Sequence, residues 1–304
     1  LISEGAKQVV AVDIKPLDEW YQINENSKNL VLDLSDGENC RIAVQSIDWV
    51  FNLAADMGGM GFIENNKALC MLSVLINTNL IKQSHNASVS RFFFASSACV
   101  YSQSKQKDPT ISGLVEADAY PADPEDGYGW EKLFSERMCR HYAEDYGLTT
   151  RVVRLHNVYG PMGAYDGGRE KAPAAICRKV VQAKQSQNNS IEIWGDGEQT
   201  RSFMYVDDCI KGIDLIMRSE NVDFPINLGS AEKVSINELV SIVEAIAEMS
   251  LARTYKLDAP KGVNGRNSDN TLINKYLGWA PNISLRQGLQ QTFNWIHAEM
   301  SVNK

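Results

Sequence analysis

A cysteine follows a predicted strand at a position where a thiol could do chemistry. The apolar run RFFF is followed by Ser96, Ser97, Ala98 and Cys99, so the thiol lies just beyond the strand end. Most buried cysteines behave as small, inert hydrophobic side chains. A free thiol has a pKa of about 8.5, however, and nearby positive charge brings its thiolate within reach of neutral pH. Cys99 is thus either a packing residue or a base that removes a proton from carbon, and this stretch alone leaves both interpretations open.

Tyr128 and Lys132 form a second candidate group, in the sequence YGWEK. Their i,i+4 spacing puts both side chains on one face of a helix. A tyrosine alone is a poor base because its pKa is about 10, so we predict that the Lys132 ammonium lowers the pKa of Tyr128. Helices contain this spacing by chance. The upstream Ser-Ser sequence makes the pair a stronger candidate, because the Ser97 hydroxyl could bind the same substrate oxygen as Tyr128.

The elements that position these residues alternate between strands and helices. Apolar runs predict strands over 8–14, 29–35, 48–55, 91–101 and 151–161, with helices over 63–85 and 128–147. Such alternation predicts βαβ units in a parallel sheet, and continuous apolar runs indicate strands that are buried on both faces. We therefore predict an α/β fold, a doubly wound parallel sheet, with a nucleotide-binding domain over 1–156 and a smaller substrate domain over 157–304.

The start of the chain lacks a feature that this fold leads us to expect. A doubly wound dinucleotide-binding domain opens with a strand, a glycine-rich turn and a helix that hold the pyrophosphate. Here the first predicted strand already ends in Asp13, an acid that suits a cofactor ribose hydroxyl. No GxGxxG precedes it. We expect that one βα unit is missing from the N-terminus, so that the domain over 1–156 is incomplete.

Composition excludes several classes of function. The net charge of -8 argues against a nucleic-acid partner, which would need a basic face. No apolar stretch approaches the length of a membrane span. The six cysteines are scattered, without a CxxC pair or zinc-like spacing, which favours free thiols in a reducing compartment and no metal site. We expect a cytoplasmic protein without membrane or nucleic-acid partners.

Three further segments, in this order along the chain, carry a family resemblance. NLAA (52–55), HNVYGP (156–161) and WGDGEQTRSFMYVDD (194–208), together with the Ser-Ser strand and YxxxK, resemble the extended short-chain dehydrogenase/reductase family and its nucleotide-sugar epimerases and dehydratases. AADMGGMGFI (54–63), SSACVY (96–101), GGREKAPAA (167–175) and GRNSDN (265–270) resemble the members that invert GDP-mannose at carbons 3 and 5. The resemblance implies a Rossmann-like fold, NAD as cofactor, GDP-mannose as substrate, a homodimer and a place in ascorbate biosynthesis.

The resemblance also implies roles for individual residues. Dehydratases of the family carry an acidic pair after the Ser-Ser strand, where this chain has Ala98 and Cys99. Cys99 would then be the base and Lys171 the acid on the other sugar face, while Tyr128, Lys132 and Ser97 serve the hydride-transfer step. The residues expected to contact NAD are Asp13, Asp33, Tyr128 and Lys132. Those expected to contact the substrate are Gly58, Ser97, Asn157, Glu170, Lys171, Ala172, Lys179, Gln199, Arg201 and Arg266, with Arg201 and Arg266 on the diphosphate.

Two alternatives stay open. Another nucleotide-sugar 4-epimerase or dehydratase would keep YxxxK and WGDG but would not need Cys99 together with Lys171. A non-catalytic binder of the same fold would follow if the natural protein has no glycine-rich loop.

Overall fold

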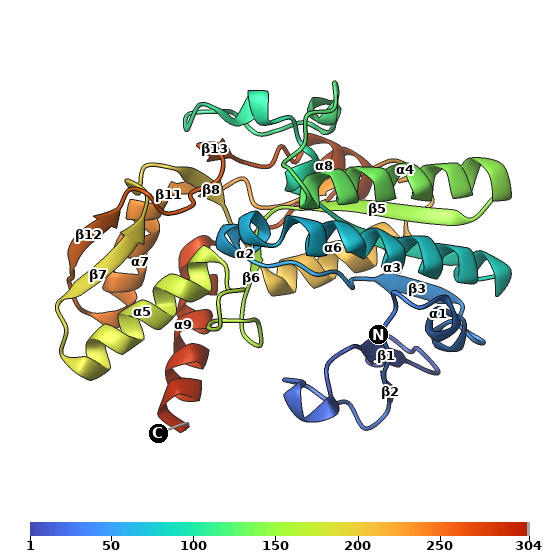
Figure 1. Cartoon of the computed structure of the whole chain (residues 1–304), viewed down its shortest axis with the longest axis horizontal. Helices are drawn as coiled ribbons and strands as arrows, with labels where there is room; N and C mark the ends of the chain where they lie inside the picture. Colours follow the sequence, from blue (N-terminus) through green and yellow to red (C-terminus); the bar gives the residue numbers. More distant parts are fainter. Residues whose placement is uncertain (303–304) are drawn as a thin grey trace.

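A parallel sheet of four strands forms the centre of the larger part of the molecule (Figure 1). The computed structural model describes residues 1–302, and in it the strand order is β10 (Ile226–Leu228), β5 (Thr149–Leu155), β4 (Arg91–Ser97) and β3 (Trp49–Asn52). Helices α1 (Gly37–Ala43), α3 (Lys67–Asn86) and α4 (Tyr128–Tyr146) contribute to the packing on one face, and α6 (Val206–Arg218) and α8 (Thr271–Leu277) to that on the other. The predicted doubly wound parallel sheet is confirmed.

The strand β4 shows why its apolar run is continuous. Phe92 and Phe94 pack against the side of the sheet that holds α3 and α4, and Phe93 packs against the opposite side with residues of α6. All three side chains are buried. Because neighbouring residues of a strand point to opposite faces, a strand covered on both faces needs apolar residues at every position.

Two strands near the N-terminus form a separate small sheet. β1 (Val10–Asp13) pairs in parallel with β2 (Lys28–Val31), and Asp13 stands opposite Val31. Within the described residues no hydrogen-bonded ladder joins β1 to β3. The additional βα unit that the sequence leads us to expect therefore stays a prediction.

Several predicted elements are confirmed in position but divided by local geometry. The run 91–101 is β4 up to Ser97 and then a single 3-10 turn, η2 (Ala98–Val100). The helical stretch from 63 is split at Asn66 into α2 (Met60–Asn65) and α3. The run 151–161 is split into β5 and β6 (Val158–Tyr159), because Asn157 between them has a φ of 43°.

The smaller part of the molecule lies at the left of Figure 1 and combines helices with short strands. Helices α5 (Ala172–Ser186), α7 (Ile236–Ala247) and α9 (Leu285–Val302) enclose one hydrophobic core. The strands around it are β7 (Ser190–Trp194) with β12 (Ala252–Lys256), β8 (Thr200–Ser202) between β11 (Lys233–Ser235) and β13 (Gly265–Arg266), and β9 (Met204–Tyr205) with β6. Short 3-10 turns complete the chain: η1 (Leu17–Glu19), η3 (Gln103–Gln106) and η4 (Glu116–Ala119).

The division at residue 157 is less simple in space than in sequence. After that residue, α6 and β10 return to the larger part, where β10 extends the main sheet beside β5. The two domains predicted from the sequence stay a prediction, with the chain crossing the boundary more than once. Over residues 1–302, none of the helices has both the length and the apolar character that a membrane span requires.

A buried polar network fixes the end of β4. Arg154 of β5 binds both carboxylate oxygens of Glu136 on α4, at 2.9 and 2.8 Å, and the Ser96 hydroxyl donates to the same carboxylate at 2.6 Å. On the far side of η2, the Tyr101 hydroxyl donates to the buried Asn227 side chain. Buried charge is tolerated only when paired and hydrogen-bonded. The network therefore clamps the chain on both sides of Cys99.

Candidate active site

Cys99 lies in the turn η2, directly beyond the carboxyl end of β4. Its backbone N–H donates to the Ser97 hydroxyl at 3.2 Å, and its sulfur accepts a hydrogen bond from Nη1 of Arg266 at 3.6 Å. The turn packs closely against the start of α4, since a Cβ on Gly129 would lie 2.4 Å from the Cys99 carbonyl oxygen. Only glycine permits that approach. The thiol is buried, with 6% of the residue exposed.

Tyr128 is the first residue of α4 and faces the same point. It is buried beside Cys99, and the Ser97 hydroxyl lies close enough to its phenol to lower the pKa. The pKa of Tyr128 is raised well above its usual value, first by burial and then by the neighbouring Cys99 and Glu131 groups, while the Ser97 bond opposes this. The predicted lowering of the pKa of Tyr128 by Lys132 is therefore wrong for the free chain.

The surroundings of Lys132 explain the difference. Its Nζ lies 5.4 Å from the centre of the Tyr128 ring, and its carboxylate partner Glu131 lies 3.4 Å away. Both side chains of the pair are almost completely buried. The Glu131 carboxylate raises the pKa of Tyr128, so the effect of the Lys132 ammonium charge is offset locally.

Lys171 approaches Cys99 from the other part of the molecule. It is the residue before α5, in a loop that docks on the segment after β3, where the Gly59 N–H donates to the Arg169 carbonyl at 3.0 Å. A Cβ on Gly59 would lie 2.5 Å from the Glu170 carbonyl oxygen. Burial lowers the pKa of Lys171, and the thiols of Cys99 and Cys209 act in the opposite direction. The amine therefore lies within electrostatic range of both thiols.

Arg201 on β8 adds another buried cation. Its guanidinium donates to the carbonyls of Thr200 at 2.8 Å, Val263 at 2.6 Å and Lys261 at 3.1 Å. Burial lowers the pKa of Arg201 to about 10, with Cys99 acting in the opposite direction. Close by in sequence, Gln199 donates its amide to the Trp194 carbonyl at 3.0 Å. Its buried oxygen has no hydrogen-bond partner among the described residues and can accept from a ligand.

Other residues expected at the substrate have protein partners of their own. Asn157 donates to the Ser202 carbonyl at 3.0 Å, Glu170 accepts from Arg178 at 3.1 Å, and Lys179 donates to the Glu192 carbonyl at 2.8 Å. Gly58 is buried, with Phe62 and Arg169 against it, and Ala172 begins α5. The structure thus brings Ser97, Cys99, Tyr128, Lys132, Lys171, Arg201 and Arg266 around one point.

The two acids expected at NAD lie apart from that point. Asp13 ends β1, and Asp33 follows the end of β2 in the same small sheet. Both side chains are exposed, and each accepts a hydrogen bond from the backbone two residues later, at 2.9 Å from Lys15 and 2.8 Å from Ser35. Their carboxylates are accessible to a ligand.

Two buried residues near Cys99 were not predicted from the sequence. Glu125 forms an ion pair with Arg266, and Gln106 accepts from Nε of Arg266 at 2.7 Å. Glu125 stands three positions before Tyr128 in PEDGY, which is the one sequence signal for it. Such a charge in a Pro- and Gly-rich loop normally indicates solvent exposure, and only the fold shows that it is buried.

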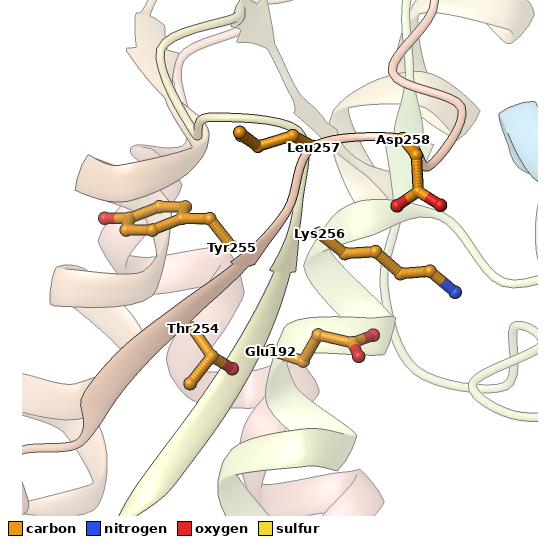
Figure 2. Close-up of a pocket in the computed structure, with 6 residues that line it drawn as sticks. All are labelled: Glu192, Thr254, Tyr255, Lys256, Leu257 and Asp258. Atoms are coloured by element: carbon orange, nitrogen blue, oxygen red, sulfur yellow. The ribbon is translucent and has the colours of Figure 1, made fainter.

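A surface hollow of about 460 Å³ lies elsewhere, at β7 and β12 (Figure 2). It is lined by Glu192, Thr254, Tyr255, Lys256, Leu257 and Asp258, and in Figure 2 the Glu192 and Lys256 side chains project to the same side of the strand pair. None of the predicted catalytic residues lines it. The convergence of buried groups on Cys99 is a stronger indication of chemistry than this open hollow.

Comparisons with known proteins agree with this arrangement. A family model described as "NAD dependent epimerase/dehydratase family" matches residues 1–229. The chain is 46% identical over 275 residues to a GDP-mannose 3,5-epimerase of Arabidopsis thaliana, covering 90% of this chain and 71% of that protein. It is also 46% identical over 305 residues to GDP-mannose 3,5-epimerase 1 of Oryza sativa subsp. indica, covering 100% of this chain and 79% of that protein.

Solved structures support the fold. A UDP-glucose 4-epimerase of Thermotoga maritima, solved with UDP-glucose, superposes with a TM-score of 0.87 at 24% identity, covering 99% of this chain and 94% of that one. A UDP-glucose 4-epimerase of Thermus thermophilus, solved with NAD, gives a TM-score of 0.82 at 20% identity, covering 97% and 93%.

Proposed function

The chain belongs to the NAD dependent epimerase/dehydratase family, and we propose that it converts GDP-mannose to GDP-L-galactose by inverting carbons 3 and 5. Inversion of carbon 5 alone would give GDP-L-gulose. The observation that carries the proposal is the half-buried Lys171 amine within electrostatic range of the buried Cys99 thiol, which packs beside Tyr128. Hydride transfer needs only the tyrosine, so the additional pair is what an epimerase that acts at carbons 3 and 5 requires.

NAD is the cofactor of the family, and the described residues fit it at two places. Asp13 and Asp33 offer exposed carboxylates at the ends of β1 and β2, suited to ribose hydroxyls. Tyr128 and Lys132 lie at the carboxyl edge of the main sheet, where ligands bind in open α/β folds. When bound, NAD supplies the hydride acceptor and later the hydride donor for carbon 4.

Tyr128 and Ser97 would handle the proton of the hydroxyl group on carbon 4. The raised pKa of Tyr128 keeps it a neutral phenol in the free chain. Proton removal must then accompany the loss of hydride from carbon 4, because a free phenolate would be costly in this buried position. The Ser97 hydroxyl would donate to the substrate oxygen on carbon 4, the oxygen that Tyr128 also contacts. The Lys132 ammonium would stabilise negative charge that develops on Tyr128.

The carbon-4 ketone acidifies the protons on carbons 3 and 5, and Cys99 with Lys171 would exchange them. Cys99 removes a proton from one face of the ring, and Lys171 delivers a proton to the other. A lysine whose pKa is lowered by burial releases its proton more readily than an exposed one. Tyr128 would return its proton to the oxygen on carbon 4 when the bound cofactor restores the hydride, so the net reaction would be an isomerisation.

The remaining substrate contacts stay proposals. Arg201 and Lys179 would meet the diphosphate, with Gln199 offering its unpaired oxygen to a donor of the ligand. Gly58, Asn157, Glu170 and Ala172 would border the site from the loops beside Lys171.

Isotope exchange tests the proposal against its alternatives. Full-length protein with NAD and GDP-mannose in deuterated water is expected to place deuterium at carbons 3 and 5 and to form GDP-L-galactose, detected by NMR. A 4-epimerase would invert carbon 4 without label at those carbons, and a dehydratase would release water. A non-catalytic binder would leave GDP-mannose unlabelled. Any of these three results would contradict the proposal.

We propose further that the protein is a homodimer through the exposed face of α3 and α4. These helices pack side by side (Figure 1), and both present large apolar side chains to solvent. Leu72 on α3 is 56% exposed and Phe134 on α4 is 49% exposed. A monomer rarely exposes such a patch, and a two-fold dimer would bury it against its own copy.

Charge introduced into this face is expected to separate the subunits. Leu72→Glu combined with Phe134→Glu should convert a dimer to a monomer in sedimentation velocity, because the carboxylates would be buried without partners. Ile210→Glu is the matched control, since Ile210 on α6 is 61% exposed and lies outside the face. A double variant that sediments like the unmodified protein would place the contact elsewhere.

The cellular compartment and the pathway of the reaction are also proposals. All six cysteines are free thiols and buried, which suits the reducing cytoplasm. GDP-L-galactose as product would place the enzyme in ascorbate biosynthesis.

A further inference from the structure

Trp295 on α9 lies between two segments that are far apart in sequence. Its ring meets the ring of Tyr165 edge to face, with the ring centres 5.4 Å apart, and the ring of Tyr21 in the same manner at 5.7 Å. Tyr165 lies in the loop that leads to Lys171, and Tyr21 lies in the segment between β1 and β2, after Asp13. Edge-to-face contacts of this kind stabilise the packing of the segments that supply the rings. Trp295 thus joins the segment beside an expected cofactor residue to the loop of the expected acid.

The groups around Tyr21 agree with this arrangement. Burial raises the pKa of Tyr21, and the neighbouring Tyr165 and Glu299 act in the same direction. Glu299 follows Trp295 by four positions, on the same face of α9. Tyr165 and Trp295 also pack against the hydrophobic core of the smaller part of the molecule. The contact between the three rings is therefore built on the packed interior of that part.

The loop after Tyr165 needs an anchor, because its middle is unsupported. Gly167 and Gly168 have φ of 84° and 85°, and a Cβ on either would meet no described atom within 4 Å outside its chain neighbours. The loop is held instead at its two ends by Arg178 of α5, which donates to the Tyr165 carbonyl at 2.8 Å and to the Glu170 carboxylate at 3.1 Å. The ring of Tyr165 fixes the first of these ends against the core, so the loop should loosen when that ring loses its partner.

We infer that Trp295 is a positioning residue for Lys171, acting through an aromatic brace that consists of Tyr21, Trp295 and Tyr165. The inference rests on the proposed function, in which Lys171 delivers a proton to the sugar. An indole ring supplies no acid or base for that transfer, so Trp295 acts only through the loop that it holds. Proton delivery to carbon requires a closely defined geometry, and a small shift of the loop is enough to slow it.

The aromatic brace also links the loop to the cofactor side of the molecule. Asp13 is expected at the cofactor ribose, and its carboxylate accepts from the backbone N–H of Lys15 at 2.9 Å. In the same segment the Trp20 indole donates to the Lys15 carbonyl at 2.9 Å, one position before Tyr21. A ligand that holds Asp13 should therefore restrain Tyr21 and, through Trp295, the loop.

Limited trypsin digestion of the full-length protein tests the aromatic brace without substrate. The rate of cleavage after Arg169, followed by mass spectrometry, reports how freely the loop opens. Trp295→Ala should raise this rate about tenfold, and Trp295→Phe should restore most of the unmodified rate. Trp279→Ala is the matched control, because Trp279 packs on the other hydrophobic core, beside α6, and it should leave cleavage after Arg169 unchanged. An unchanged rate in Trp295→Ala would overturn the inference.

Tyr21→Ala keeps the test decisive if Trp295→Ala fails to fold, since Tyr21 is 53% exposed. Saturating NAD should slow cleavage after Arg169 in the unmodified protein, and most of this protection should be lost in Tyr21→Ala. Equal protection in the two proteins would refute the link between the cofactor side and the loop.

Turnover separates positioning of Lys171 from general damage to the site. With saturating NAD and GDP-mannose in deuterated water, Trp295→Ala should lower the ratio of inverted product to deuterium exchange about tenfold, while KM and the amplitude of transient NAD reduction stay within about threefold. An equal fall in transient NAD reduction would contradict a role directed at Lys171. Faster cleavage after Arg169 in a Trp295→Ala protein, when the unmodified protein does not epimerise GDP-mannose, would refute the proposed function and leave the aromatic brace standing.

Discussion

Cys99→Ala is expected to slow deuterium exchange at carbons 3 and 5 of GDP-mannose by roughly 100- to 10,000-fold, the range for a lost general base. Transient reduction of NAD should survive, because Tyr128, Ser97 and Lys132 remain in place. Stopped-flow absorbance of the reduced cofactor and NMR of the sugar ring separate the two steps. The variant would then still transfer hydride between carbon 4 and NAD, with almost no deuterium exchange at carbons 3 and 5.

A matched control distinguishes a base from a packing residue. Cys139→Ala also removes a completely buried thiol, in the core between α4 and the sheet. It should lower stability through lost packing while leaving exchange per folded molecule nearly unchanged. If Cys99→Ala behaves like Cys139→Ala, with exchange close to normal, Cys99 belongs to the core and the base must be sought elsewhere.

The fold could be predicted from the sequence because the patterns that indicate its strands and helices are local. Continuous apolar runs such as RFFF mark strands covered on both faces, and the alternation of such runs with helical patterns implies a parallel sheet. Gly147, which ends α4 with a φ of 71°, is a local stop signal of the same kind. The breaks inside predicted elements at Asn66 and Asn157 could not be read in this way, because they depend on how the neighbouring segments dock.

The candidate site could be predicted only in part, because most of its residues are far apart in sequence and meet only in the folded chain. YxxxK lies within one helix, so its spacing alone brings Tyr128 and Lys132 together. Lys171 stands far along the chain and was found only through the family resemblance. The contacts of Glu125 and Gln106 with Arg266 join segments far apart in sequence. The sign of the shift in the pKa of Tyr128 was missed because burial, its largest cause, is a property of the folded chain.

Proton delivery by Lys171 should also depend on pH. The amine can donate only while it is protonated, and burial lowers its pKa below the ordinary lysine value. The ratio of inverted product to deuterium exchange should therefore fall as pH rises through this lowered pKa, and it should stay high below that pKa. The same ratio is then measured across this pH range for Lys171→Arg. If Lys171 is the group that titrates, this pH dependence should disappear in the variant.

Lys171→Arg tests most directly whether this residue delivers the proton opposite Cys99. Inversion requires removal of a proton from one face and delivery to the other, so one group cannot easily do both. Arginine keeps the positive charge but releases its proton far less readily. In full-length enzyme with NAD and deuterated water, the variant should still exchange label through Cys99, with retention, and return mostly labelled GDP-mannose. Inverted product should fall by about 100-fold or more.

Lys184→Arg serves as the control for this variant, since Lys184 lies on α5, the helix that follows Lys171, and its amine donates to the Ala247 carbonyl. It should keep normal inversion, because no proton transfer to carbon depends on it. The two variants share the same chemical change, so a difference between them isolates the proton-donating role from general effects of the substitution. Labelled, inverted product at a normal rate in Lys171→Arg would exclude Lys171 as the acid. The proton would then have to come from water or from a tyrosine near Cys99.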